Sequence, residues 1–466
     1  MMDARRKEKK QMRDLKIINA RIPDYEQDCI REAELLIRDG KIEKIRERGA
    51  ITEETAETID AKEQIVSAGF VDIHAHEDAP EGNFFTSECC LKMGVTTKIA
   101  GNCGDTFEDL PHFAERLKKS GSPTNYMIFL GQNTLRQMVG ADDRYAPSTP
   151  EQLEKMKEIV KNSLPYAPVG LSCGFEYAPG VTLEETLDLL TAFDEKDYIV
   201  SVHFRSDGPC AAASTEEVVE LSKRSGYKVQ MSHIGSCSAV GYMRDTLDVL
   251  DKARAEGVDI MSDCYPYHAF CTGIGTAVFD EESFSKWDYS DLMITAGPYK
   301  NQRCTKELFE KLRKEDPDMY VVAFVMNEEE IDMAYKQPYV MVGSDCGFVD
   351  QAGHPRGAGT FPRILGRYVR ERKVMSLMDA LKKMTLLPAQ RVNLTHKGEV
   401  KEGYDADLVI FDENTIIDRA TFEEPTLPPE GISYVLLNGE VAVRNNEIVN
   451  GRLGTYIPYA SAAKRG

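Results

Sequence analysis

The chain has 466 residues, of which 42% are hydrophobic and 29% are charged, a composition typical of a soluble protein with a large core. Its formal net charge is −20 at pH 7. This acidic surplus argues against nucleic acid and against an anionic membrane surface as partners, because both attract clustered Lys and Arg. No apolar run in the sequence approaches the roughly 18 residues of a membrane span.

Two features of the chain indicate a cytoplasmic protein. Residues 1–14 are charged and no apolar segment follows them, so we expect a flexible leader rather than a secretion signal. The eleven cysteines are odd in number and scattered through apolar segments, as in proteins that keep their thiols reduced. The sequence leaves open whether the protein forms an oligomer.

Short strands and tight turns are predicted at both ends of the chain. Residues 15–22 and 34–45 are apolar runs, and the second contains the hairpin signal Asp39-Gly40. Near the C-terminus, further runs are separated by turns at Asn438-Gly439 and Asn445-Asn446; they cover residues 407–411, 434–437, 441–443 and 448–449. We expect residues 15–67 and 396–466 to pair into one small β-sandwich domain.

The central part of the chain, residues 68–395, alternates short apolar runs with amphipathic helical patterns. Strands separated by helices of about 10–15 residues predict βα units with a parallel sheet. Eight runs are candidate strands, at residues 70–76, 95–100, 125–130, 169–173, 198–203, 228–233, 258–263 and 339–345. Eight is the count of a (β/α)₈ barrel of the TIM type. The charged stretch 276–338 interrupts the alternation and is interpreted as an inserted lid or subdomain.

Polar side chains with metal-binding chemistry follow several of these strands. Four of the eight histidines do so, namely His74, His76, His203 and His233, and Asp345 ends the last run. The active site of a parallel barrel lies at the C-terminal ends of its strands. A single histidine at a strand end is usually structural, but this combination indicates a metal centre. His74 and His76, two residues apart, would point to the same side of a strand.

Cys103 is a further candidate ligand. It lies in Gly101-Asn102-Cys103-Gly104, directly after the run 95–100. The flanking glycines permit a tight turn, and a thiolate binds zinc well. The alternative is an inert buried cysteine, which describes most free cysteines. The strand-end histidines favour the ligand.

The order of these segments resembles the amidohydrolase superfamily, and within it the D-aminoacylase (N-acyl-D-amino-acid deacylase) branch. GFVDIHAH is similar to the first-strand signature of the superfamily. GNCG, GLSCGFEYAPG, VHFRSDG, MSH, YPY, GSD and HPRGAGTFPRILG follow in the order typical of the branch, as does the tail MTLLPAQRVNLTHKGEVKEGYDADLVIFD. The resemblance implies a (β/α)₈ barrel with a small β-sandwich built from both chain ends.

The resemblance also implies roles for individual residues. Cys103, His203 and His233 match the ligands of a tightly bound zinc ion, and His74 and His76 could frame a second, weaker metal position with Cys103. Asp345 matches the catalytic aspartate, which acts as general base and acid during deacylation of an N-acyl amino acid.

Four residues are candidates for contact with the substrate. Tyr177 and Arg356 match substrate-contacting positions of the branch, and the Arg356 fork could bind a carboxylate bidentately. The alternative for Arg356 is a structural salt bridge. Either Tyr265 or Tyr267 could donate to the developing oxyanion.

One departure from the branch leaves the substrate open. The branch usually has a lysine two residues after the histidine that corresponds to His233, and Gly235 stands there in this chain. A cyclic-amide hydrolase of the hydantoinase or dihydroorotase kind, or a dipeptide hydrolase, is therefore an alternative, although VGLSCGFE lacks the carboxylated lysine of many such enzymes. A non-catalytic small-molecule-binding protein on the same scaffold is the alternative of another class.

Overall fold

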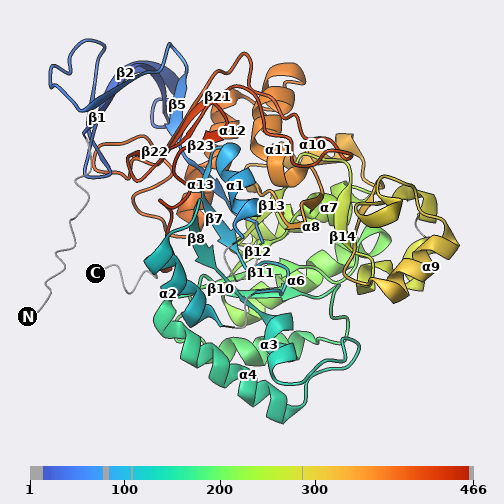
Figure 1. The fold of residues 1–466 in the computed structure, drawn as a ribbon. Helices are drawn as coiled ribbons and strands as arrows, with labels where there is room; N and C mark the ends of the chain where they lie inside the picture. Colours follow the sequence, from blue (N-terminus) through green and yellow to red (C-terminus); the bar gives the residue numbers. More distant parts are fainter. Residues whose placement is uncertain (1–13, 77–82, 107–108, 286, 461–466) are drawn as a thin grey trace, which may run out of the picture.

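The computed structural model describes residues 14–76, 83–106, 109–285 and 287–460. All but the last residue of the predicted leader, 1–14, lie outside these ranges. Figure 1 shows a central barrel with helices around it, a sheet from both chain ends at one side and a smaller inserted unit at the other. Within the described ranges, no helix is both long and apolar enough to cross a membrane.

The eight predicted barrel strands are confirmed. They form two parallel sheets, in the orders β6-β7-β8 and β9-β10-β11-β12-β13-β17. Only Phe129 separates β8 from β9, so these two segments act as one strand that joins the sheets. The strands are β6 (Phe70–Asp72), β7 (Val95–Ala100), β8 (Asn125–Ile128), β9 (Leu130–Gly131), β10 (Gly170–Gly174), β11 (Ile199–His203), β12 (Lys228–Met231), β13 (Ile260–Cys264) and β17 (Val340–Val342).

Backbone contacts connect the first and last strands of the barrel. Ala75, just past β6, forms a parallel bridge with Cys346, just past β17. The Asp345 N–H donates to the His74 carbonyl at 2.8 Å, and the His76 N–H donates to the Cys346 carbonyl at 3.1 Å. These bonds bring the residues after β6 and β17 together at one edge of the barrel.

Helices cover the outside of the barrel. A 3₁₀ turn continues helix α5 (Leu183–Leu189) to Ala192. The helices are α1 (Phe85–Lys92), α2 (Leu110–Ser120), α3 (Gln132–Met138), α4 (Pro150–Ser163), α5 (Leu183–Leu189), α6 (Ala211–Ser225), α7 (Ile234–Ser238), α8 (Met243–Ala255), α10 (Glu328–Tyr335), α11 (Arg356–Arg363), α12 (Leu377–Met384) and α13 (Leu386–Arg391). Thr149 and Gln152 form a capping box at the start of α4.

The strands from the two chain ends pair in one nine-stranded sheet. The contact between the ends is the antiparallel pair of β5 and β20, in which Val66 lies opposite Ile410. Asp39 and Gly40 both have positive φ, 48° and 76°, as the predicted hairpin turn requires. The strands are β1 (Leu15–Asp24), β2 (Cys29–Arg38), β3 (Lys41–Arg46), β4 (Glu57–Asp60), β5 (Ile65–Ala68), β20 (Leu408–Phe411), β21 (Ile432–Leu437), β22 (Glu440–Arg444) and β23 (Glu447–Ile448).

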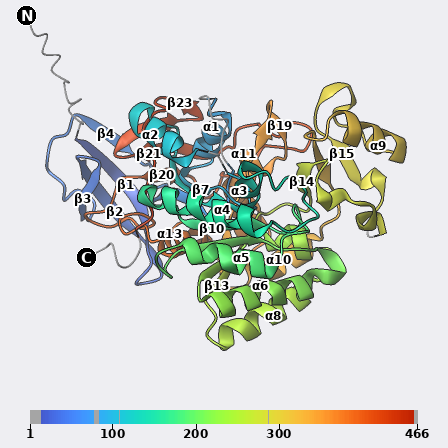
Figure 2. The same cartoon turned by 90° about the horizontal axis from the view of Figure 1, so that it is seen from below.

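A small antiparallel sheet and a helix follow β13. They are β14 (Phe270–Gly273), β15 (Leu292–Ile294), β16 (Tyr320–Ala323) and α9 (Lys306–Glu315). β14 precedes the predicted insertion, residues 276–338, and the other three elements lie within it. Figures 1 and 2 place this unit at the opposite end of the molecule from the nine-stranded sheet. Arg144, between α3 and α4, donates to the Gly275 carbonyl at 3.1 Å, and Tyr145 donates to Asp280 at 2.8 Å. The insertion is thereby tied to a barrel loop.

Candidate metal centre

Four buried side chains from four strand ends converge at one point of the barrel. His74, Cys103, His233 and Asp345 offer ligand atoms that all lie within 4.8 Å of one another. Cys103 Sγ lies 3.4 Å from His74 Nε2 and 3.2 Å from His233 Nε2. Asp345 Oδ1 lies 3.6 Å from His74 Nε2. The residues follow β6, β7, β12 and β17, so the parallel barrel assembles the cluster from segments far apart in the chain.

The two remaining predicted ligands flank this cluster on opposite sides. His76 Nε2 lies 3.0 Å from Asp345 Oδ1, and its side chain is 27% exposed. His203 Nδ1 lies 3.0 Å from His233 Nε2. The structure thus brings all the predicted ligands and Asp345 together, but the mutually close group contains His74 and not His203.

Three of the converging residues have an unusual backbone conformation. Cys103, His233 and Asp345 have positive φ angles of 57°, 28° and 51°. Non-glycine residues rarely adopt such angles, and those that do concentrate at functional sites. Hydrogen bonds hold two of them in place, since the His233 N–H donates to Asp263 Oδ1 at 2.8 Å and the Asp345 N–H is bound as described above.

Each of two central imidazoles has a partner behind it. His74 Nδ1 faces Asp263 Oδ1 at 3.1 Å, although without the alignment of a hydrogen bond. His233 Nδ1 lies 2.8 Å from Ser236 Oγ, whose hydroxyl also contacts the His233 carbonyl at 3.0 Å. Both rings turn Nε2 toward Cys103, with the Ser236 hydroxyl bonded to the rear nitrogen of His233 and the Asp263 carboxylate beside that of His74. Groups behind a ligand commonly fix its orientation in this way.

The ionisation states follow from burial and from Arg356. Burial opposes the charge on Asp345, but Arg356 Nη1, 2.9 Å from Asp345 Oδ2, and the nearby histidines outweigh it and hold the pKa of the carboxyl well below its usual range. Burial lowers the pKa of His233, so its imidazole is neutral. Burial, together with Asp345 and Asp263, raises the pKa of the Cys103 thiol.

These donors fit a borderline-soft divalent metal ion. A carboxylate, two imidazoles and one cysteine form a nitrogen, oxygen and sulfur set that such ions prefer. Burial and the two carboxylates raise the pKa of the Cys103 thiol, and a bound metal cation would reverse that effect, because a coordinated thiol loses its proton.

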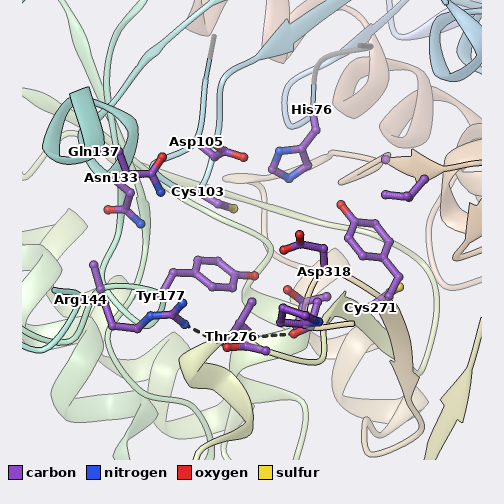
Figure 3. A pocket seen from close by; sticks show the side chains of 18 of the residues that line it. His76, Cys103, Asp105, Asn133, Gln137, Arg144, Tyr177, Cys271, Thr276 and Asp318 are labelled. Atoms are coloured by element: carbon purple, nitrogen blue, oxygen red, sulfur yellow. Dashed lines mark hydrogen bonds between the residues drawn. The ribbon is translucent and has the colours of Figure 1, made fainter. Parts of the chain in front are cut away.

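A cavity of about 610 Å³ opens beside the cluster. Figure 3 shows His76, Cys103, Tyr177, Arg144 and Asp318 among the side chains that surround it. Residues of the insertion, including Thr276 and Asp318, line it together with barrel residues. A cavity of this size accommodates a small molecule.

The predicted substrate-contacting residues differ in their placement. Tyr177 lines the cavity, with its ring centroid 4.6 Å from that of His203. Arg356 also lines it; its guanidinium contacts Asp345 and the Cys271 carbonyl and lies 4.7 Å from the Tyr265 ring centroid.

The two candidate tyrosines point to different surroundings. Tyr265 lines a smaller pocket that also contains His203, His233 and Arg356. The Tyr267 hydroxyl lies 3.5 Å from Asp418, and Arg363 covers the Tyr267 ring. The structure therefore places Tyr265 beside the cluster and directs Tyr267 away from it.

Gly235 has a packing explanation. A Cβ atom at this position would lie 2.8 Å from Cys264 Sγ and 3.3 Å from Met326 Cε. A side chain here would begin in the packed space between α7 and β13. The glycine is therefore matched to Cys264.

Two acidic residues that contact the histidines were not predicted as site residues from the sequence. Asp263 faces His74, and Glu176 Oε2 lies 2.8 Å from His203 Nε2. A signal was available for both, because Asp263 ends the run 258–263 and Glu176 follows β10 by two residues.

Comparisons with known proteins agree with this architecture. The sequence pattern of the amidohydrolase family matches residues 333–443. The chain is 30% identical over 445 residues to an N-acyl-D-glutamate deacylase of Alcaligenes xylosoxydans xylosoxydans, a match covering 88% of this chain and 89% of that relative.

Solved structures extend the similarity to the whole fold. The N-acyl-D-glutamate deacylase from Bordetella bronchiseptica, in complex with zinc and a phosphonate inhibitor, superposes with a TM-score of 0.86 at 29% identity and covers 96% of this chain and 99% of that one. A D-aminoacylase studied for its binuclear metal centre gives a TM-score of 0.83 at 25% identity, with coverage of 96% and 99%. The chain belongs to the amidohydrolase family, in its D-aminoacylase branch.

Proposed function

We propose that the protein hydrolyses the linear amide bond of an N-acyl-D-amino acid, or of a related N-acyl compound, with zinc as its metal. The observation that carries the proposal is the set of metal-binding atoms of His74, Cys103, His233 and Asp345, all within 4.8 Å of one another beside the cavity. The names of the relatives, an N-acyl-D-glutamate deacylase and a D-aminoacylase, support the reaction class.

In this proposal, Cys103, His203 and His233 hold the tightly bound zinc ion. His74 and His76, with Cys103, frame a second and weaker metal position. The zinc complex of one relative and the binuclear centre of another support this arrangement. Zinc supplies Lewis-acid activation of the amide carbonyl and of water.

Asp345 is the proposed general base and acid. Its carboxylate lies at the cavity, within 3.0 Å of His76 Nε2, and Arg356 keeps it ionised. An ionised carboxylate accepts the proton of the attacking water and returns it to the leaving nitrogen. The proposed role of Asp345 therefore depends on Arg356, which contacts the carboxylate and keeps it ionised.

Arg356 and Tyr177 are the proposed contacts for the substrate. The Arg356 guanidinium borders the cavity and can bind a carboxylate through two parallel hydrogen bonds. Between the two tyrosines considered as oxyanion donors, the surroundings of Tyr265 favour it over Tyr267, because Tyr265 packs beneath Arg356.

We also propose a division into three parts: a β-domain of residues 15–67 and 396–466, a barrel of residues 68–395 and a lid near 276–338. The pairing of β5 with β20 supports the first part. The hydrogen bonds of Arg144 and Tyr145 to the insertion support a lid that covers the cavity.

The test is turnover of zinc-loaded protein on matched panels of N-acyl-D-amino acids, N-acyl-L-amino acids, hydantoins, dihydroorotate and dipeptides. We expect release of the free D-amino acid, with the D-series hydrolysed faster than the L-series. Hydrolysis confined to the cyclic amides or the dipeptides would contradict the proposal in favour of those enzyme classes. Binding of the N-acyl compounds without turnover would favour a non-catalytic binding protein.

A further inference from the structure

Glu176 is held beside His203 by the register of two barrel strands. In the parallel pair of β10 and β11, Gly174 lies opposite His203. The Phe175 N–H, one residue past the end of β10, donates to the His203 carbonyl at 3.0 Å. The two segments therefore stay paired just beyond the ends of β10 and β11. The next side chain, that of Glu176, places Oε2 at 2.8 Å from His203 Nε2.

This contact determines which nitrogen of His203 carries the proton. An ionised carboxylate can only accept a hydrogen bond, so Nε2 of a neutral His203 must be the N–H donor. The lone pair of the ring is then on Nδ1, which lies 3.0 Å from His233 Nε2 on the side of the metal-binding cluster. Both side chains are largely buried, at 5% exposure for His203 and 12% for Glu176, so water competes weakly for the bond.

His203 is thereby the reverse of the other two rings. His74 and His233 turn Nε2 toward Cys103 and keep Nδ1 for Asp263 and Ser236. His203 keeps Nε2 for Glu176 and turns Nδ1 inward. A freely rotating imidazole could present either nitrogen, so the carboxylate is the group that selects one.

We propose that Glu176 is the positioning residue of His203: it fixes the ring with Nδ1 as the metal-binding atom and increases the basicity of that atom. This inference rests on the proposed function only in taking His203 as a zinc ligand. The amino-acid substrate and the hydrolytic step do not enter it.

The first test is zinc affinity, measured by competition with a chromophoric chelator in the absence of substrate. In Glu176→Ala the ring loses its partner, and we expect zinc to bind about 10–100-fold more weakly. In Glu176→Gln an amide oxygen can still accept from Nε2–H, so the loss should be smaller. Unchanged zinc affinity in Glu176→Ala would overturn the proposal.

Glu185→Gln is the matched control. Glu185 is another buried glutamate, 4% exposed, but it is bound to Arg136 at 2.9 Å. This variant should unfold at a lower temperature and keep the wild-type zinc affinity. An equal loss of zinc affinity in Glu176→Ala and Glu185→Gln would assign Glu176 a merely structural role.

The second test is the ring tautomer itself. In ¹⁵N-histidine NMR spectra of zinc-loaded protein, the His203 signals should show a protonated Nε2 and a metal-bound Nδ1. Coordination through Nε2 would overturn the proposal. Tight zinc binding without any deacylation would contradict the proposed substrate and leave this inference standing, whereas wild-type protein that binds no zinc would overturn both.

Discussion

The two sides of the candidate metal centre are built differently. On one side, His76 is partly exposed to the cavity, and its neighbour Asp345 is an ionised carboxylate held by Arg356. On the other side, His203 and His233 are buried, and Glu176 and Ser236 occupy the nitrogens that face away. We infer that the side with His203 and His233 holds the metal ion, while the side with His76 and Asp345 transfers the proton and binds the substrate.

The largest expected effect comes from removing the charge on the reactive side. Asp345→Asn keeps the size of the side chain but cannot accept a proton from water, so kcat/KM should fall by roughly 10²–10⁴-fold. Zinc content, measured by elemental analysis, should stay at the wild-type value, because the side with His203 and His233 is intact. Wild-type turnover in this variant would remove Asp345 from the mechanism.

Next in size is the loss of the thiol. Cys103→Ala removes the one sulfur donor of the cluster. Loss of a group that only orients a ligand weakens metal binding by up to roughly 100-fold, and we expect the loss of this ligand to weaken zinc binding by more than that. Chelator competition measures the change. Cys173→Ala, which removes another buried cysteine, in β10, is the control and should retain zinc. Full zinc occupancy in Cys103→Ala would return Cys103 to the class of inert buried cysteines.

A smaller effect is expected from the cation on the reactive side. Arg356→Ala should lower the preference for a substrate with a free carboxylate over its carboxamide by about tenfold, because a hydrogen bond between charged groups contributes roughly 1.5–3 kcal/mol. Comparing the two substrates within one variant separates this effect from the support that Arg356 gives Asp345. An unchanged preference would leave Arg356 with the structural role alone.

The smallest effect concerns packing behind the centre. Gly235→Ala introduces a Cβ 2.8 Å from Cys264 Sγ, and we expect a net loss of about 1 kcal/mol in the free energy of unfolding, since overpacking exceeds the gain in helix propensity. Cys264→Ala in the same chain should restore most of it, measured by urea denaturation in a double-mutant cycle. A raised KM in Gly235→Ala at wild-type stability would instead connect this position with the substrate.

The barrel and most of the site could be predicted because they depend on local patterns. Each strand is a short apolar run, and parallel strands bring the residues that follow them to one edge, so His74, His203, His233 and Asp345 could be grouped from the sequence. The orientation of the rings could not be predicted. It depends on Glu176, which the register of β10 and β11 places beside His203, and on Asp263 of β13, which faces His74 after β6.

The surroundings of Tyr267 and Gly235 could not be predicted from the sequence either. Two tyrosines separated by one residue were equivalent candidates in the sequence, but Arg363 and Asp418 from distant segments hold Tyr267 away from the cluster. The absence of a lysine at position 235 suggested an altered substrate. The structure gives a packing reason instead, because any side chain at this position would collide with Cys264. Both depend on packing between elements that no local pattern specifies.

The most direct test of the difference between the two sides is a matched pair of histidine variants. His203→Asn and His76→Asn each remove one imidazole next to the cluster, and their zinc affinities can be compared by chelator competition on proteins of equal purity. We expect His203→Asn to lose the tightly bound zinc ion and His76→Asn to retain it. Retention in His203→Asn together with loss in His76→Asn would show that the metal is held on the side of Asp345 and would contradict the account.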